Sequence, residues 1–372
     1  MISRQAMVDE FCELVQIDSL SGKEGRVAEV LARKLTDLGL SVHFDNAHEA
    51  IKGEVGNLIA YLPATDASLP TLMLQSHMDT VAPGEGIQPL VSDTYVTSGS
   101  DTILGADAKS GITVILHALR EVIAAGVPHG ELQVVFCISE ETGLLGAYHL
   151  DYTKVNPKYC FVFDGGRQPG IMTTCAPSAF KMTYRLKGLA SHAGVHPERG
   201  ISAIQAAAQA IARMKLGRID FETTANIGVI QGGTARNIIP DSCTLLAEAR
   251  SHDENKLQRQ MDHMAMCLRH AALESGAELL EPEVLASYRR FFLPDDAEIV
   301  QIAWRAAEAL GYEPRTEVGG GGSDANVFNE RGIPALICPT GGEGAHTLQE
   351  RLDIDAFVGC ARFLVQIIST AR

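Results

Sequence analysis

The sequence lacks the features that mark membrane-spanning and nucleic-acid-binding proteins. No apolar run approaches the ~18 residues of a membrane-spanning helix, and acidic side chains interrupt the apolar positions of the N-terminal stretch, so we expect no signal peptide there. Basic residues are few and unclustered, with 31 Lys and Arg against 46 Asp and Glu and a net charge of −15. This negative charge argues against nucleic acid and anionic membranes as partners.

Cysteine patterns typical of structural cross-links are also missing. The eight cysteines are scattered, form no C-x-x-C pair, and in several cases lie within apolar, strand-like segments. This arrangement predicts reduced, buried thiols in a cytoplasmic protein, and argues against a disulfide framework or a thiolate zinc site.

The length and composition predict two globular domains. The chain has 372 residues, 46% hydrophobic and 21% charged, and domains average roughly 150 residues. In the first part, predicted helices over 4–15, 24–38 and 111–125 alternate with apolar strands, of which 132–138 and 159–163 are nearly continuous. Continuous apolar strands between helices indicate an α/β sheet covered on both faces.

A different pattern occupies the middle of the chain. Its predicted elements follow the order β-α-β-β-α-β: strand 178–188, helix 200–215, strands 224–231 and 242–250, helix 254–275 and strand 282–291. This is the split βαβ, or ferredoxin-like, arrangement. The α/β pattern then resumes with a helix over 296–310, a strand over 335–338 and a helix from about 355. We therefore predict one domain from residues 1–176 and 292–372, with residues 177–291 inserted into it.

Residues with metal-binding side chains follow four apolar strands, three of them directly and the fourth after a Gly-rich loop. They are His77 and Asp79 in LMLQSHMDT, Glu140 and Glu141 in CISEETG, Asp164 in FVFDGG and His346 in LICPTGGEGAH, with Asp107 in LGADAKSG at the start of a predicted helix. In open α/β sheets, ligands bind outside the carboxyl ends of the strands. These side chains can therefore meet at one edge of the sheet.

The residue types favour a divalent metal site. Two imidazoles and several carboxylates, with no thiolate, suit zinc or a similar ion. A single catalytic ion needs three protein ligands, whereas five are available. Five ligands with one bridging fit two ions about 3.5–4 Å apart. The five are His77, Asp107, Glu141, Asp164 and His346.

Two sequence pairs suggest further roles. His77 and Asp79 lie on the same side of a strand, so Asp79 can hold the second ring nitrogen of His77. The side chains of Glu140 and Glu141 diverge, so that one can bind metal while the other faces a substrate water. Each motif alone is ordinary, because such residues are commonly turn, cap or surface positions. Their occurrence at successive strand ends is what favours a site.

Two glycine-containing loops are candidates for phosphate sites. GADAKSG has Ala108 where a phosphate-binding loop requires glycine before Lys109, so we exclude that interpretation. GGGGSDAN, over 319–326, could cradle a phosphate or carboxylate with backbone N–H groups or form a mobile turn, and both interpretations stay open.

The motifs together resemble a known family. His77-x-Asp79, GADAKSG, SEETG, the DGG that begins at Asp164, GLASHAG, GGTARNIIPD and His346 occur in the order of the di-zinc peptidases that include peptidase T, glutamate carboxypeptidase and the aminoacylases. TSGSDTILGADAKSG is most similar to peptidase T, whereas SHAGVHPERG resembles the carboxypeptidase and aminoacylase branch. The resemblance implies an α/β catalytic domain with a mixed sheet flanked by helices, and an inserted α+β domain that serves as a lid and dimerisation domain.

The resemblance also implies roles for the residues of the metal site. Asp107 would bridge two zinc ions, the peptide bond after it would be cis, and Asp79 would orient His77. Glu140 would be the general base. The remaining ligands would divide into His77 and Asp164 for one ion, and Glu141 and His346 for the other.

The inserted domain would supply substrate contacts in such an enzyme. His192 would stabilise the oxyanion, and Arg236 and Asn237 would hold a substrate carboxylate or carbonyl. In relatives with a lid of this size, the lid pairs with that of a second subunit and lends its histidine across the interface. We therefore predict a homodimer.

The implied activity is hydrolysis of an amide or peptide bond in a small substrate, similar to that of a tripeptide aminopeptidase. Carboxypeptidase and N-acyl-amino-acid deacylase activities stay open, because a substrate amine needs a nearby acid and a carboxylate needs a group such as Arg236. The metal could be zinc, cobalt or manganese. A non-catalytic metal- or peptide-binding protein on the same scaffold is the alternative from another class.

Overall fold

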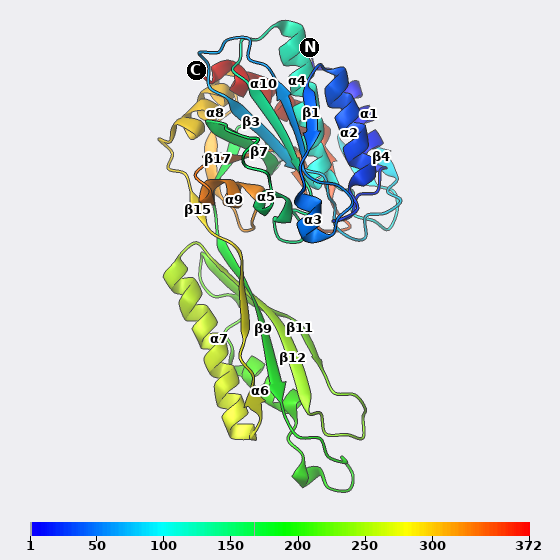
Figure 1. Cartoon of the computed structure of the whole chain (residues 1–372), viewed down its shortest axis with the longest axis vertical. Coiled ribbons are helices and arrows are strands. Elements are labelled where there is room, and N and C mark those ends of the chain that lie inside the picture. Colours follow the sequence, from blue (N-terminus) through cyan, green and yellow to red (C-terminus); the bar gives the residue numbers. More distant parts are fainter. Residues whose placement is uncertain (1, 167) are drawn as a thin grey trace. The chain divides into compact units, whose positions relative to one another are not determined.

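The computed structural model describes residues 2–166 and 168–372, which form two compact units (Figure 1). The α/β unit comprises Met1–Ala176 and Phe291–Arg372, and the inserted unit comprises Pro177–Arg290. The sequence places the insertion over 177–291. No helix in the described residues is both long and apolar enough to cross a membrane.

The α/β unit is built on a nine-stranded mixed sheet with the order β1-β2-β6-β3-β7-β17-β8-β15 and β16 beside β8. The strands are β1 (Ser41–Phe44), β2 (Leu58–Leu62), β3 (Leu72–His77), β6 (Leu132–Cys137), β7 (Tyr159–Gly165), β8 (Ile171–Ala176), β15 (Phe291–Phe292), β16 (Arg315–Val318) and β17 (Ala335–Pro339). The central neighbours β6, β3, β7 and β17 are mutually parallel. Their carboxyl ends therefore lie at one edge of the sheet.

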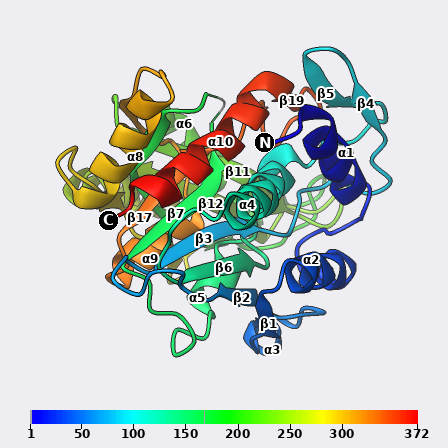
Figure 2. The ribbon, with the colours of Figure 1, turned by 90° about the horizontal axis from the view of Figure 1, so that it is seen from above.

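Helices cover both faces of this sheet, which explains why its central strands are buried along almost their whole length. Ser76 donates its hydroxyl proton to Ala108 O of α4, whereas its neighbour Gln75 donates to Asp324 of α9. Because consecutive strand residues point to opposite faces, α4 and α9 lie on opposite sides. Figure 2 shows α1, α4, α8 and α10 together on one side of the strands.

The helix bounds are as follows. The α/β unit contains α1 (Arg4–Val15), α2 (Gly25–Asp37), α3 (Ala47–Ile51), α4 (Ala106–Ala125), α5 (Leu145–Tyr148), α8 (Glu298–Ala309), α9 (Asp324–Glu330) and α10 (Ile354–Thr370). Side-chain caps mark several of their first turns: Ser3 accepts the N–H of Ala6, and Asp353 accepts that of Ala356.

Helix α4 packs very closely on the sheet because its first turns contain Gly111. A Cβ atom at this position would lie 2.0 Å from Phe163 O of β7. The backbone of Asp107 and Ala108 at the start of α4 is not helical, and the peptide bond between them is cis, as the family resemblance implied.

A second, antiparallel sheet in the α/β unit was not predicted from the sequence. It has the order β18-β19-β5-β4, with β4 (Pro89–Val91), β5 (Tyr95–Ser98), β18 (Gly342–Glu343) and β19 (Arg351–Asp353). Strands this short have too few residues to show an alternating pattern. The loop that carries His346 joins β18 to β19.

The inserted unit has the predicted β-α-β-β-α-β order. Its main elements are β9 (Ser178–Lys187), α6 (Ala203–Arg213), β11 (Thr223–Gly232), β12 (Ser242–Ser251), α7 (Glu254–Ser275) and β14 (Glu283–Tyr288); β10 (Gly217–Arg218) and β13 (Glu278–Leu279) are short additions. The antiparallel order β11-β12-β9-β14 is that of a ferredoxin-like sheet. Its core includes Ala206 and Ala210 of α6, Leu268 of α7 and Leu245 of β12. The predicted fold class is confirmed.

One local prediction requires correction, and part of the segment GGGGSDAN is helical. The strand expected over 282–291 divides into β14, which pairs with β9, and β15, which pairs with β8 of the other unit. Between them the N–H of Arg290 donates to Ser178 Oγ, at the point where the chain passes between units. GGGGSDAN is not wholly a turn, because α9 begins at Asp324 behind the N-cap Ser323.

Candidate metal and catalytic site

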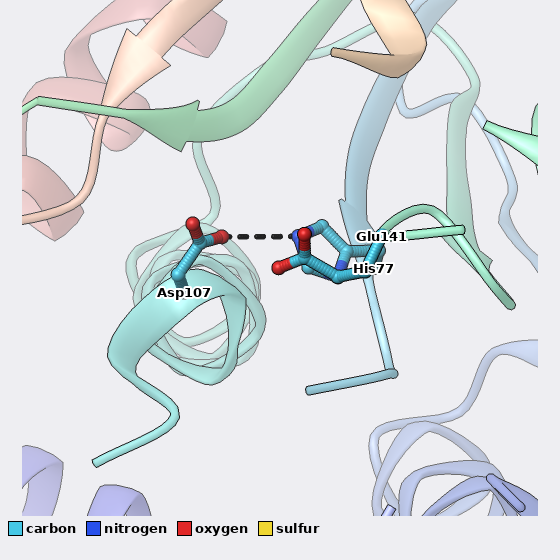
Figure 3. Close-up of side chains that lie close together, drawn as sticks. All are labelled: His77, Asp107 and Glu141. Atoms are coloured by element: carbon cyan, nitrogen blue, oxygen red, sulfur yellow. Dashed lines mark hydrogen bonds and ion pairs between the residues drawn. The ribbon is translucent and has the colours of Figure 1, made fainter. Parts of the chain in front are cut away.

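His77 and Asp107 form the centre of the site at the carboxyl edge of the main sheet. His77 ends β3 and its side chain is 1% exposed. Its Nε2 lies 3.1 Å from Asp107 Oδ1 and 3.4 Å from Asp164 Oδ1, which comes from the neighbouring strand β7. Figure 3 shows His77, Asp107 and Glu141 converging from three different segments.

The second oxygen of Asp107 faces the other histidine. His346 Nε2 lies 3.4 Å from Asp107 Oδ2 and 2.9 Å from Glu141 Oε1. His77, Asp107 and Glu141 each offer one ligand atom within 4.8 Å of the others. All five residues predicted as ligands thus lie in one connected group, with Asp107 between two halves: His77 with Asp164, and His346 with Glu141.

The sheet explains this convergence. Strands β6, β3, β7 and β17 are adjacent and parallel, and each is followed directly or through one loop by a member of the group. Side chains that are far apart in the sequence therefore lie close together at this edge of the sheet.

Asp79 is fully buried. Its Oδ1 lies 3.3 Å from His77 Nδ1 and accepts the N–H of Glu140 at 3.0 Å. Its Oδ2 accepts the N–H of Glu141 at 3.1 Å and the hydroxyl of Ser21 at 2.6 Å. Asp79 therefore contacts His77, as predicted, and also the turn that carries Glu140 and Glu141, which the sequence did not reveal.

The pKa values in the group reflect its crowded negative charge. Burial together with the charge of Asp107 raises the pKa of Asp164 to about 6. Burial, with Asp164, Asp324 and Glu141 nearby, raises the pKa of Glu140 well above its usual range, although His77 opposes the shift. Contacts with Asp107 and Glu141 raise the pKa of His346 to about 10.

The donor set fits divalent cations. Five carboxylates, those of Asp79, Asp107, Glu140, Glu141 and Asp164, surround two imidazoles, and without metal the group favours protonation of His77 and His346. Neutral imidazole and carboxylate are the ligand types of catalytic zinc. Cations at this position would replace those protons and balance the carboxylates.

Three further buried acids surround the site and were not predicted. Glu350 accepts hydrogen bonds from the backbone N–H groups of Gly105, Ala106 and Asp107. Glu24 accepts the N–H of Ser139 at 3.0 Å, and Asp324 accepts from Gln75 at 2.6 Å. None of the three had a local signal of a buried acid, because the run SDAN indicates only the start of α9 through the capping box of Ser323 and Asn326.

A cavity of about 300 Å³ opens beside the group. Its walls include Asp107, Asp164, Glu350, Thr340 and the glycine-rich segment from Gly342 to Gly344. A space of this size admits a small ligand of a few residues rather than a folded chain.

The three predicted substrate contacts lie in the inserted unit. His192, Arg236 and Asn237 are exposed, and their two loops run side by side, joined by a β-bridge between His192 and Ile238 and by the hydrogen bond from Ala193 N to Asn237 O at 3.0 Å. The structure therefore brings the two predicted motifs of the inserted unit together.

Sequence comparisons identify the family of the chain. Residues 73–370 match the Peptidase family M20/M25/M40. The chain belongs to this family. Among M20 relatives, Uncharacterized protein YqjE of Bacillus subtilis is 39% identical over 371 residues, covering 100% of both chains, and Peptidase T of Brevibacillus brevis is 24% identical, covering 97% of both.

Solved M20 structures have the same fold over the full length. Aminopeptidase PepT from Bacillus cereus is 40% identical with a TM-score of 0.89, covering 100% of this chain and 99% of that one. A tripeptidase from Staphylococcus aureus is 39% identical with a TM-score of 0.94, covering 100% of both. The predicted family and the predicted class are confirmed: the chain is an enzyme of the M20 peptidases.

A more distant neighbour, described as a dinuclear metal binding peptidase of the M20 family, is the YXEP protein of Bacillus subtilis. It is 18% identical with a TM-score of 0.70, and covers 98% of this chain and 97% of its own. At this identity the likeness extends to the fold alone.

Proposed function

We propose that this M20 peptidase hydrolyses short peptides with two divalent metal ions, and that these ions are zinc. The ions would be held by residues of β3, β7 and the β18–β19 loop together with Asp107 and Glu141. The observation that carries the proposal is Asp107, whose two oxygens face different histidines, His77 at 3.1 Å and His346 at 3.4 Å. A carboxylate placed in this way is suited to bridge two ions. His77 and Asp164 would complete one site, and Glu141 and His346 the other.

Bound ions would supply two kinds of chemistry, a lowered pKa for a coordinated water and polarisation of the scissile carbonyl. The protein's own general base is Glu140. It accepts a proton from the attacking water and delivers that proton to the leaving amine nitrogen. The hydrogen bond from its N–H to Asp79 fixes the backbone on which its carboxylate stands.

The substrate proposal follows the relatives. The structures described as an aminopeptidase and a tripeptidase are 40% and 39% identical over essentially the whole chain. We therefore propose release of the N-terminal residue from a short peptide. His192 would stabilise the oxyanion, and Arg236 and Asn237 would hold a substrate carboxylate or carbonyl.

We also propose a cytoplasmic homodimer that pairs through the inserted unit acting as a lid. The eight cysteines are free and seven of them are buried, which fits a reducing compartment.

The first experiment measures metal content and hydrolysis together. Purified protein should carry close to two divalent ions per chain, cleave tripeptides, lose activity on chelation, and recover it with zinc, cobalt or manganese. Blocked peptides and N-acyl amino acids in the same panel test the alternatives: preference for an acyl amino acid would make the enzyme a deacylase, and release of the C-terminal residue would make it a carboxypeptidase. Absence of bound metal and of hydrolysis after metal addition would refute the proposal.

A further inference from the structure

Glu350 contacts the backbone at the start of α4 from a distant part of the sequence. Its Oε2 accepts the N–H groups of Gly105 at 2.6 Å and Ala106 at 3.3 Å, and its Oε1 accepts that of Asp107 at 3.1 Å. The partners are separated by 243 to 245 residues. One buried carboxylate therefore binds three consecutive backbone donors that end at Asp107.

These donors need a partner from outside the helix. The first N–H groups of any α-helix have no acceptor within it, and the backbone of Asp107, with φ −82° and ψ 105°, departs from helical geometry. The carboxylate of Glu350 is the acceptor for these N–H groups, and its side chain is only 2% exposed.

The segment that carries Glu350 also contacts the side chain of Asp107. His346 approaches Asp107 Oδ2, while Glu350 binds the Asp107 N–H. The segment is anchored by the hydrogen bond from Glu350 N to Thr347 O at 3.0 Å and by β19, which begins at Arg351 and pairs with β5. Both the main chain and the side chain of Asp107 are thus held by one short segment.

We propose that Glu350 is a positioning residue that fixes the main chain of Asp107, so that its two carboxylate oxygens face the two halves of the metal site. This inference rests on the proposed two-metal function. Glu350 would act through Asp107, because its carboxylate accepts the N–H of Asp107 and those of the two residues before it.

A substrate-binding role is the main competing explanation, since Glu350 also lines the 300 Å³ cavity. The two roles differ in what they change. A substrate contact alters KM and leaves metal binding unchanged, whereas a residue that positions Asp107 alters metal affinity in the absence of substrate and lowers kcat.

The test titrates metal-free wild type, Glu350→Gln and Glu350→Ala with zinc, and measures tripeptide hydrolysis by the same proteins. Glu350→Gln keeps the shape but turns an amide N–H₂ toward backbone donors. Loss of such an outer contact typically weakens metal affinity by about 10- to 100-fold, and misplacement of a reacting group by about 1 Å can cost ~10²-fold in rate. We expect losses of this size in affinity and kcat, with KM within about threefold of wild type. Glu313→Gln, at an exposed position of the same unit, is the matched control.

Chemical rescue separates the missing carboxylate from general damage. Because Glu350 borders the cavity, acetate should reach the space left by Glu350→Ala and restore part of the zinc affinity, whereas acetamide should not. Glu350→Asp, which keeps the charge with a shorter reach, provides a second variant if the others fold poorly, and it should bind zinc more weakly than wild type.

The outcomes are distinct. Wild-type zinc affinity and kcat in Glu350→Gln would overturn the inference, and so would a change confined to KM. If Glu350→Gln folds poorly, the same results in Glu350→Asp would overturn it. If wild-type protein itself bound no zinc, cobalt or manganese, the proposed function would fail, and with it the premise of this inference.

Discussion

Asp79 and Glu140, 61 residues apart in the sequence, are joined by a hydrogen bond from the N–H of Glu140 to Asp79 Oδ1 at 3.0 Å. The same oxygen lies 3.3 Å from His77 Nδ1. The carboxylate that orients a candidate metal ligand therefore also fixes the backbone of the candidate general base. One buried side chain therefore contacts both the candidate metal ligand His77 and the candidate general base Glu140.

Replacing Asp79 with Asn should weaken both functions. An amide has only one acceptor oxygen, so its N–H₂ would face one of the groups that now donate to Asp79: the N–H of Glu140 or Glu141, or Ser21. We expect a loss of about 10- to 100-fold in zinc affinity and a lower kcat, measured by zinc titration and tripeptide hydrolysis. Asp66→Asn is the control, because the side chain of Asp66 is exposed and accepts its hydrogen bonds from nearby Ser68. Unchanged affinity and kcat would show that Asp79 positions nothing.

Glu140→Gln should remove the base and keep the metal. Glu140 is 8% exposed and lies next to the ligand candidate Glu141, and the role we propose for it is proton transfer rather than ligation. Loss of a general base typically costs about 10²- to 10⁴-fold in rate, so kcat should fall by that range while the metal content stays near two ions per chain. Elemental analysis and steady-state kinetics on the same preparation check this. Activity at the wild-type level would exclude Glu140 as the base.

A buried charge cluster away from the site should make stability depend on pH. Burial alone would raise the pKa of Glu10, but Arg120, His117 and Lys34 outweigh it and lower the pKa far below the ordinary value of 4.5. Because the folded-state pKa is depressed, the stabilisation is complete above the unfolded-state pKa and is lost as pH falls below it.

Glu10→Gln tests this dependence. Breaking a buried ion pair costs roughly 3–5 kcal/mol, and since Arg120 is 35% exposed we expect a smaller loss of about 2 kcal/mol at pH 7. The difference in unfolding free energy between wild type and variant should shrink when urea unfolding is repeated at a pH below 4.5. A difference that does not change with pH would contradict the depressed pKa of Glu10.

Gly111→Ala should push α4 away from the sheet. The new Cβ would lie 2.0 Å from Phe163 O and 2.6 Å from Ser76 Oγ, and overpacking of this kind costs about 1–3 kcal/mol. Phe163 is next to Asp164, and Gly111 lies four residues after Asp107, so a shift of α4 would also move these two ligand candidates. Zinc affinity should therefore fall as well as the melting temperature. Gly320→Ala is the control, because a Cβ atom added at Gly320 would have no other atom of the described residues within 4 Å. Equal melting temperatures for the two variants would refute the close packing of α4.

The sequence by itself determined the main architecture and the set of ligand candidates. Each of the strands β3, β6, β7 and β17 contains a short apolar run, and each candidate except Asp107 follows such a run closely or across one loop. Ligand candidates of this kind can be predicted from the sequence because each lies close in the chain to the strand that positions it. The β-α-β-β-α-β order of the inserted unit was readable for the same reason: each of its elements is long enough to show its own periodicity.

Only the tertiary structure decided how these residues are held. The donors to Glu350 lie 243 to 245 residues away, the second role of Asp79 depends on backbone groups at Glu140 and Glu141, and β18 and β19 are too short for a pattern. A sequence pattern reports periodicity over a few residues, whereas a buried carboxylate is stabilised by whichever backbone donors the fold brings to it. For that reason the ligand candidates could be predicted from the sequence, and the buried acids that support them could not.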